Sequence, residues 1–316
     1  KMFVLEKLYG GNIHAYQPLI PEVLQRWAVE ENRWMFYGIN ADMEAVGIIA
    51  LSAVDDTAVI RYIYLLPESR EQGIMERAFS ELMFELRDEG YSGIEMNYIP
   101  SEYPAVREIA NRFDFTEHQT DRAYFRFRAS DIRNCKAASF APQNIMRLGV
   151  LPPEHQETII RMIRENGYDI PNPGGFRVRA EENMSLMEYS LVYMENNRPK
   201  GALLVQDTSN NKMPEGAAAF GKIYPEPAAA NLMLIYVGTL QTKAPLYLLS
   251  GLCRNVIKDF DDKALLTGYF SLGHVTNLFE GALGVKGNRE VTASLSFDTL
   301  DRFYIDEGSD DVMNLA

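Results

Sequence analysis

The sequence predicts a mixed α/β protein made of two similar domains in tandem. Residues 58–66 are apolar or aromatic except for Arg61, which is typical of a strand covered on both faces. A turn and an amphipathic helix follow this strand, and the same order of elements returns near residue 232. A chain of 316 residues, 47% of them hydrophobic, is long enough to fill two cores.

The first half of the chain alternates between strands and helices. Short apolar or alternating runs predict the strands, and apolar positions at helical spacing predict the helices. The predicted strands are Met2–Leu8, Trp34–Ile39, Ala45–Val54, Ala58–Leu66, Ser92–Ile99 and Arg122–Arg128. The predicted helices are Tyr16–Val29, a helix from Ile74 to a stop at Gly90, and Tyr103–Phe113.

The turn between the apolar strand and the next helix has the properties of an anion-binding loop. A helix N-terminus offers unpaired backbone N–H groups and a partial positive charge, so a turn without bulky side chains can hold a diphosphate there. Gly73 stands where this turn must bend, in the segment Arg70-Glu71-Gln72-Gly73-Ile74-Met75.

This segment resembles the acyl-coenzyme A loop of the GCN5-related N-acetyltransferase (GNAT) family, whose pattern is Arg/Gln-x-x-Gly-x-Gly/Ala. Met75 departs from the pattern, and its side chain either narrows the approach to the turn or points into the core. The resemblance implies that each domain is a mixed, mostly antiparallel, α+β-like sheet flanked by helices. It also implies acetyl-CoA as cosubstrate, its pyrophosphate held by backbone groups of the loop and its thioester by those at the end of the preceding strand. The implied cofactor-binding residues are Tyr64, Leu65, Leu66, Arg70, Glu71, Gln72, Gly73, Ile74 and Met75.

The reaction implied by the resemblance is direct attack of a neutral primary amine on the thioester carbonyl of an acyl-CoA. Glu95, in the middle of a predicted strand, is the candidate base, with a solvent-facing carboxylate as the alternative. The family's acid is a tyrosine before a Gly-Phe pair, but Ala110 and Asp114 stand at the tyrosine and glycine positions here. Tyr98 and Tyr103 flank the loop at the start of the same helix and could reach the sulfur. Tyr103 is the candidate acid, with core packing as the alternative. Proton relay through water would require neither side chain.

A second copy of the same order of elements follows. The strand Leu232–Leu240 matches Ala58–Leu66 at an offset of 174 residues, and the strand from Ala264 matches the one from Ser92 at an offset of 172. No glycine follows Leu240, and a proline at the start of the next helix removes a donor that a diphosphate would use. This copy is therefore predicted to be degenerate, to lack the cofactor and to help shape a substrate cleft. Its other predicted elements are the helix Leu246–Phe260, a worn family motif at Asn277–Gly284 and the strand Glu290–Phe297.

We predict an N-terminal domain with the acyl-CoA loop over residues 1–140 and a degenerate C-terminal domain over residues 141–316. Apolar periodicity lapses in Ala129–Gln143, which is predicted to be a linker. The stretch Asp207–Asn231 is rich in Asn and Pro and is predicted to be an insertion in the second copy. This insertion is either an ordinary loop, a lid or an oligomer contact. The last of these alternatives would make the protein a homo-oligomer.

Composition narrows the classes of partner. The net charge of −13 argues against nucleic acid and favours a cationic small-molecule or peptide amine, although excess acid is also a solubility device. No apolar run reaches the length of a membrane span, so no membrane partner is expected. The four histidines are isolated from one another, which predicts no metal site. Cys135 and Cys253 lack Cys-x-x-Cys spacing, and a reducing cytoplasm is the simplest setting, with a disulfide between them as the alternative.

Together these features predict an acyl-CoA-dependent N-acyltransferase that moves an acetyl group from acetyl-CoA to a primary amine. The alternative is a non-catalytic module of the same fold that binds or senses acyl-CoA, which the departures at Met75 and Ala110 would favour.

Overall fold

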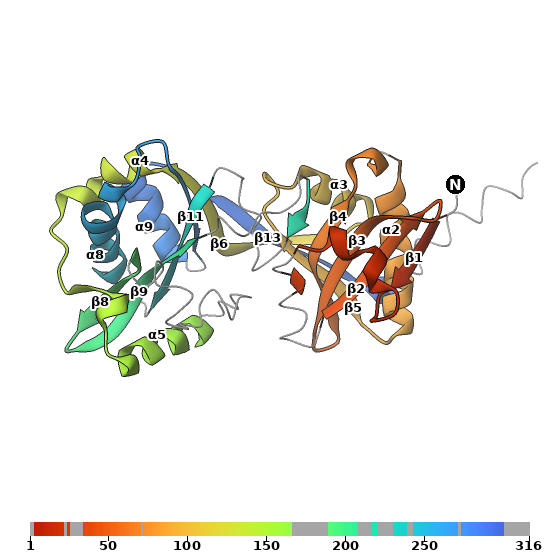
Figure 1. Ribbon diagram of the computed structural model, residues 1–316, viewed down its shortest axis with the longest axis horizontal. Coiled ribbons are helices and arrows are strands. Elements are labelled where there is room, and N and C mark those ends of the chain that lie inside the picture. The colour runs from red at the N-terminus through yellow and green to blue at the C-terminus, as the bar shows by residue number, and fades with distance from the viewer. Residues whose placement is uncertain are drawn as a thin grey trace, which may run out of the picture. The chain divides into compact units, whose positions relative to one another are not determined.

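The computed structural model describes residues 3–21, 24–25, 34–70, 72–165, 189–207, 216–219, 230–238, 243–270 and 273–299 (Figure 1). The chain divides into two compact units. Unit 1 comprises Lys1–His118, Pro214–Tyr224 and Val291–Ala316, and unit 2 comprises Gln119–Met213 and Pro225–Glu290. Each unit is made of separate stretches of chain. The predicted domain limits 1–140 and 141–316 instead describe two contiguous copies, and they stay a prediction.

Unit 1 is built on a sheet in which only one pair of neighbouring strands is parallel. The strand order is β1-β2-β3-β4-β5-β13, and β4 and β5 form the parallel pair. The last described strand, β13, therefore completes the sheet that the first described strand begins. The strands are β1 (Phe3–Lys7), β2 (Trp34–Ala41), β3 (Glu44–Val54), β4 (Thr57–Leu65), β5 (Gly93–Tyr98) and β13 (Asn288–Ser296).

Two helices cover one face of this sheet. They are α2 (Ile74–Asp88) and α3 (Pro104–Arg112), and their apolar positions enter one buried cluster with alternate residues of the strands. In β5, for example, Ile94, Met96 and Tyr98 are buried in this cluster, while Glu95 and Asn97 belong to the other face. The amphipathic pattern of α2 predicted this packing because its apolar stripe has no other surface to cover.

A short segment near the N-terminus packs on the second face of the sheet. The structure has the 3-10 turns η1 (Ile13–Ala15) and η2 (Gln17–Leu19) where the sequence predicted the start of a helix over Tyr16–Val29. That prediction is wrong for residues 17–19, because Pro21 lacks the N–H that a helix continuing from these residues needs. Residues 24–25 are helical as predicted, and the N–H groups of Leu24 and Gln25 donate to the Pro21 carbonyl. Residues 22–23 and 26–33 lie outside the described residues.

Unit 2 repeats the strand order of unit 1. Its order is β7-β8-β9-β11-β12-β6, with β11 and β12 as the parallel pair and antiparallel neighbours elsewhere. Helices α8 and α9 share a buried cluster with this sheet, and α5 packs on β9 and β11 (Figure 1). The elements are β6 (Thr116–Arg128), β7 (Ile145–Arg147), β8 (Leu191–Glu195), β9 (Arg198–Asp207), β11 (Ala230–Gly238), β12 (Leu265–Phe270), α4 (Ala129–Arg133), α5 (Pro153–Glu165), α8 (Lys243–Gly251) and α9 (Gly273–Leu283).

The backbone register bears out the internal repeat. In unit 1, Ala58 pairs with Ile94 and Val59 with Glu95. In unit 2, Leu232 pairs with Leu266 and Met233 with Thr267, which are the partners given by offsets of 174 and 172 residues. The predicted tandem arrangement of mixed, mostly antiparallel sheets flanked by helices is confirmed.

The predicted linker Ala129–Gln143 is instead largely part of the core of unit 2. It forms α4 and the 3-10 turn η4 (Lys136–Ser139), and Ala129, Ile132 and Ala137 are fully buried. The periodicity lapses because the segment consists of a five-residue helix and a 3-10 turn, each too brief to show a helical repeat.

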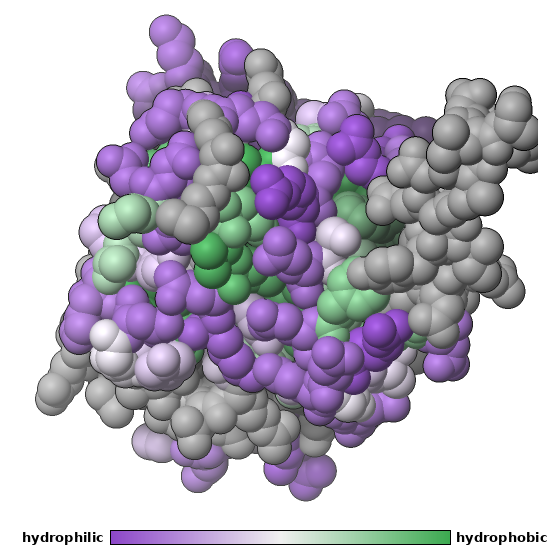
Figure 2. Space-filling view, turned by 90° about the vertical axis from the view of Figure 1, so that its right-hand side faces the viewer, coloured by the Kyte–Doolittle hydropathy of each residue, from purple (hydrophilic) through white to green (hydrophobic). Residues whose placement is uncertain are grey.

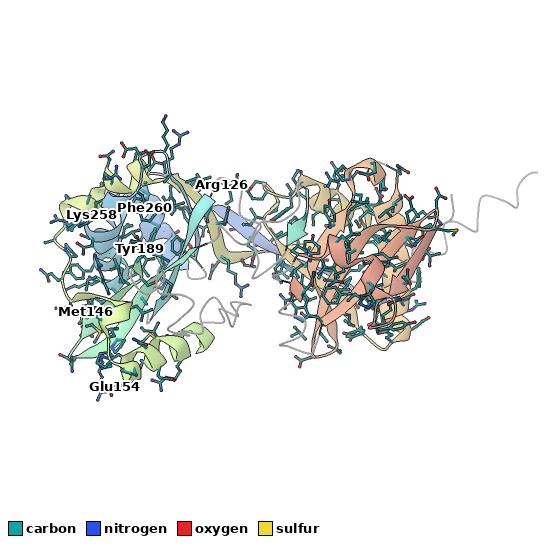
Figure 3. All side chains as sticks on the ribbon, viewed as in Figure 1. Arg126, Met146, Glu154, Tyr189, Lys258 and Phe260 are labelled. Carbon is teal, nitrogen blue, oxygen red and sulfur yellow. The ribbon has the colours of Figure 1, made fainter. Side chains whose placement is uncertain are left out.

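Two contacts illustrate how residues distant in sequence pack in unit 2. The Sγ atoms of Cys135 and Cys253 lie 3.5 Å apart as free, buried thiols, and the hydrogen bond between them lowers the pKa of Cys135 below its usual value. The rings of Tyr189 and Phe260 meet edge to face with centroids 5.6 Å apart (Figure 3).

The space-filling view shows one face of the molecule, on which hydrophilic residues predominate, with apolar residues in patches between them (Figure 2).

Within the part of the chain that the structure describes, no helix is long and apolar enough to span a membrane.

Replacement of Gly38 by alanine is expected to lower the free energy of unfolding by about 1–3 kcal/mol, because a Cβ there would lie 2.4 Å from Cζ of the Tyr16 ring. Urea denaturation followed by circular dichroism measures the change. Gly10→Ala is the matched control, since nothing lies within 4 Å of its Cβ position. Equal denaturation midpoints for G38A and the wild type would show that the Tyr16 ring is not seated on β2.

Candidate acyl-CoA site

The site begins where two parallel strands separate. Strands β4 and β5 pair only at their first residues, from Thr57 with Gly93 to Val59 with Glu95. In unit 2 the corresponding strands stay paired as far as Ile235 with Tyr269, two residues further by the repeat offset. The edge of β4 beyond Val59 is therefore released from β5.

The backbone groups on this open edge follow from the alternation of a strand. The N–H of Leu66 donates to the carbonyl of Val46 at 2.8 Å, on the β3 side. Polar groups of successive residues point to opposite edges, so those of Leu65 and Ile63 face the open side. Consistent with this, the Leu65 carbonyl accepts a hydrogen bond from Arg70 Nε at 3.0 Å. Of the three predicted thioester positions, Leu65 thus has the outward-facing amide.

The loop after β4 is tied to itself and delivers the chain to α2. Pro67–Ser69 form a 3-10 turn, and Gln72 Nε2 donates to the Glu68 carbonyl at 2.7 Å. Gly73 is the N-cap of α2 with φ 67°, a left-handed conformation that favours glycine. The first-turn amides of α2, from Ile74 onward, have no acceptor within the helix and can bind an anion.

These features border one pocket of about 1020 Å³ within unit 1. Its charged side chains are Arg70 and Arg112 against Glu76 and Glu108, and the rest of the lining is largely apolar. Arg112 Nη1 lies 2.8 Å from Glu76 Oε1, which neutralises a carboxylate in the first turn of α2. The lining residues are Ile63, Tyr64, Leu65, Arg70, Gly73, Ile74, Met75, Glu76, Ala105, Val106, Glu108, Ile109, Asn111, Arg112, Gly216 and Ala218.

Six of the nine predicted cofactor-binding residues line this pocket: Tyr64, Leu65, Arg70, Gly73, Ile74 and Met75. The Met75 side chain was predicted either to narrow the approach to the turn or to point into the core. It borders the pocket and also packs against the core cluster. Leu66 and Gln72 are not among the lining residues. Glu71 lies outside the described residues.

The two predicted catalytic side chains are not among the residues that line the pocket. Glu95 accepts a hydrogen bond from Asn97 Nδ2 at 3.1 Å, and Asn97 Oδ1 accepts one from Thr292 Oγ1 at 2.6 Å. Glu95 therefore belongs to a polar row on the face of β5 opposite α2. Tyr103 is the N-cap of α3 and packs, half-buried, against the core cluster. Their catalytic roles stay predictions.

The departures from the family pattern at the end of α3 have different physical meanings. Asp114 adopts φ 53°, and Phe115 N–H donates to the Ala110 carbonyl at 2.9 Å, as in a Schellman helix end. A glycine in the family pattern suits this left-handed position, and aspartate is among the residues that tolerate it. Ala110 has no hydroxyl and is fully buried, so this position cannot supply the proton that the family's tyrosine supplies.

Several pocket residues were not predicted from the sequence. Glu76 lies on α2 and Arg112 on α3, and both line the pocket, but their mutual ion pair is a tertiary contact. Gly216 and Ala218 come from the predicted insertion, and the sequence carries no signal that they meet β4. Among the described residues, His, Cys, Asp and Glu side chains form no cluster of three that could hold a metal ion.

Comparison with known proteins shows what the chain is similar to. Residues 4–115 match the family model described as acetyltransferase (GNAT) family. The fold of the described residues is similar to that of a tandem GNAT protein, which confirms the resemblance found in the sequence.

Two solved structures illustrate this likeness. One is a tandem GNAT protein from the clavulanic acid biosynthesis pathway, solved without AcCoA: 12% identity, TM-score 0.57, covering 93% of this chain and 98% of that one. Another is a GCN5-related N-acetyltransferase from Sphaerobacter thermophilus: 12% identity, TM-score 0.50, covering 93% of this chain and 95% of that one. A comparison with curated protein sequences found no match.

Glu76→Gln is expected to bind CoA about two- to five-fold more tightly than the wild type, because it removes a negative charge beside the α2 N-terminus and frees Arg112 for a diphosphate. Arg112→Gln is expected to weaken binding by a similar factor. Isothermal titration at low ionic strength measures both. Glu81→Gln, at an exposed position later in α2, is the matched charge control and should leave the affinity unchanged. Weaker binding by E76Q would contradict this arrangement of charges.

Proposed function

We propose that the protein is an acyl-CoA-dependent N-acyltransferase that transfers an acetyl group from acetyl-CoA to a primary amine. The observation that carries the proposal is the separation of β4 from β5 beside the Gly73 turn, with both features bordering one pocket. A diphosphate at the α2 N-terminus and a thioester at Leu65 would then be bound by backbone groups of one continuous loop.

The reaction would proceed by direct attack. The neutral amine nitrogen forms a bond to the thioester carbon, the carbon–sulfur bond breaks, the nitrogen loses a proton to the base, and the thiolate takes up one proton from the acid. The outward N–H of Leu65 is suited to stabilise the oxyanion, because backbone donors need no reorganisation during the reaction. Glu95 as base and Tyr103 as acid stay proposals, and relay through water serves both steps if neither side chain reaches the cleft.

The acceptor is proposed to be a cationic small-molecule or peptide amine. The net charge of −13 attracts such substrates electrostatically and disfavours nucleic acid. Cysteine usage supports a cytoplasmic setting, since both cysteines are free, buried thiols.

A second candidate function is an acyl-CoA-binding or sensing module without turnover. Burial of Ala110 at the family's tyrosine position and the absence of Tyr103 from the pocket lining favour it. Release of free thiol from acetyl-CoA over a panel of amines separates the two. Thiol release that requires an amine supports the enzyme, and tight binding without release on any amine supports the module.

Gly73→Glu is expected to weaken acetyl-CoA binding at least ten-fold, since it places a side chain and a negative charge at the turn that would hold the diphosphate. Isothermal titration measures the affinity. Gly90→Glu is the matched control, because Gly90 follows the other end of α2, also has positive φ and has nothing within 4 Å of its Cβ position. Equal affinities of G73E and G90E would place the diphosphate elsewhere, and no binding by the wild type would remove both candidate functions.

A further inference from the structure

A short strand from the second half of the chain lies on the open edge of β4. Strand β10 (Ala218–Ala219) pairs antiparallel with β4, Ala218 with Ile63 and Ala219 with Tyr62. At these positions β3 already pairs with β4, through Ile49 and Ala50. Strand β10 therefore uses the other edge, the one that β5 leaves after Val59.

The same short segment is fitted against the acyl-CoA loop. Gly216 has φ 76°, and a Cβ on it would lie 2.6 Å from Arg70 Nη1. The guanidinium of Arg70 thus lies directly against Gly216 while its Nε holds the Leu65 carbonyl. Ala217 and Ala218 are buried, and Gly216 and Ala218 line the pocket.

From these contacts we infer that Gly216–Ala219 is an internal competitor of the pantetheine arm for the open edge of β4. The inference rests on the proposed function. An arm that joins a diphosphate at Gly73 to a thioester at Leu65 must follow this edge, where the chain already pairs with Ile63 and Arg70 occupies the Leu65 carbonyl. Extended ligands add to a sheet by the same backbone hydrogen bonds that a strand uses, so strand and ligand exclude each other.

The arrangement implies binding in two stages. The turn at Gly73 borders the pocket while β10 is in place, so the nucleotide and diphosphate of CoA can dock first. The pantetheine arm then displaces β10 from Ile63. The cost of releasing β10 lowers the apparent affinity for CoA but not for a nucleotide that lacks the arm.

Ala218→Pro tests this competition, because proline removes the N–H that the alternation of β10 directs toward Ile63. We expect A218P to bind CoA at least ten-fold more tightly than the wild type, and 3′-phospho-ADP, which lacks the pantetheine arm, equally well. Ala219→Pro is the matched control, since residue 219 opposes Tyr62, whose polar groups face β3, and its own N–H points away from β4. Isothermal titration measures all three proteins.

Each outcome of the titration decides a separate point. Equal CoA affinities in the wild type and A218P overturn the competition and leave the proposed function standing. No binding of either ligand to any of the folded proteins overturns the proposed function and the competition with it. A gain for 3′-phospho-ADP equal to that for CoA would mean that β10 obstructs the nucleotide, which also overturns the inference.

Hydrogen exchange on the wild-type protein provides a test without mutation. Saturating CoA should speed exchange of the amides in residues 216–219 several-fold, whereas saturating 3′-phospho-ADP should leave it unchanged. Slower or unchanged exchange with CoA would show that β10 stays on β4 when the arm is bound, and would overturn the inference.

Discussion

The released edge of β4 is the constraint on which the rest of unit 1 depends. A strand that leaves its neighbour exposes N–H and C=O groups that must find other partners. Here Arg70 donates a hydrogen bond to the Leu65 carbonyl, and Ala218 of β10 pairs with Ile63. The loop, the start of α2 and the pocket are arranged around this edge. The backbone groups that would bind an acyl-CoA are the ones that Arg70 and β10 contact in the structure.

The two units show how one strand order supports different sites. Both sheets contain a single parallel pair in the same register, but β11 and β12 stay together for longer than β4 and β5 do. The difference is small in length, yet it decides how much backbone is free near the following helix. The residues that join β11 to α8 lie outside the described part of the chain, so the comparison rests on the strands themselves.

The electrostatics of the pocket are balanced rather than strongly basic. Two arginines face two glutamates, and Arg112 pairs with Glu76 at the start of α2. Ion pairs at this exposure contribute little to the stability of the fold. Their main effect is on the electrostatic potential that a charged ligand meets in the pocket. Recognition of a diphosphate would therefore rest chiefly on backbone amides of the α2 N-terminus, which explains why the glycine at the turn was the clearest signal in the sequence.

The sequence by itself determined the local elements and their repetition. Apolar periodicity placed β1 to β5, α2 and α3 closely, and the offsets of 174 and 172 residues predicted the pairing of Leu232 with Leu266. Strand β6 begins at Thr116, before the predicted start at Arg122, and β8, β9 and α5 were not predicted. Apolar periodicity failed where local rules compete, as at Pro21 in the predicted first helix and in the short helix and 3-10 turn of the predicted linker. Tertiary structure alone decided that β13 completes the sheet of unit 1, that Arg112 meets Glu76, and that Ala218 reaches Ile63. Such contacts join residues far apart in the chain, and periodicity carries no information about them because it records only which side of an element is apolar.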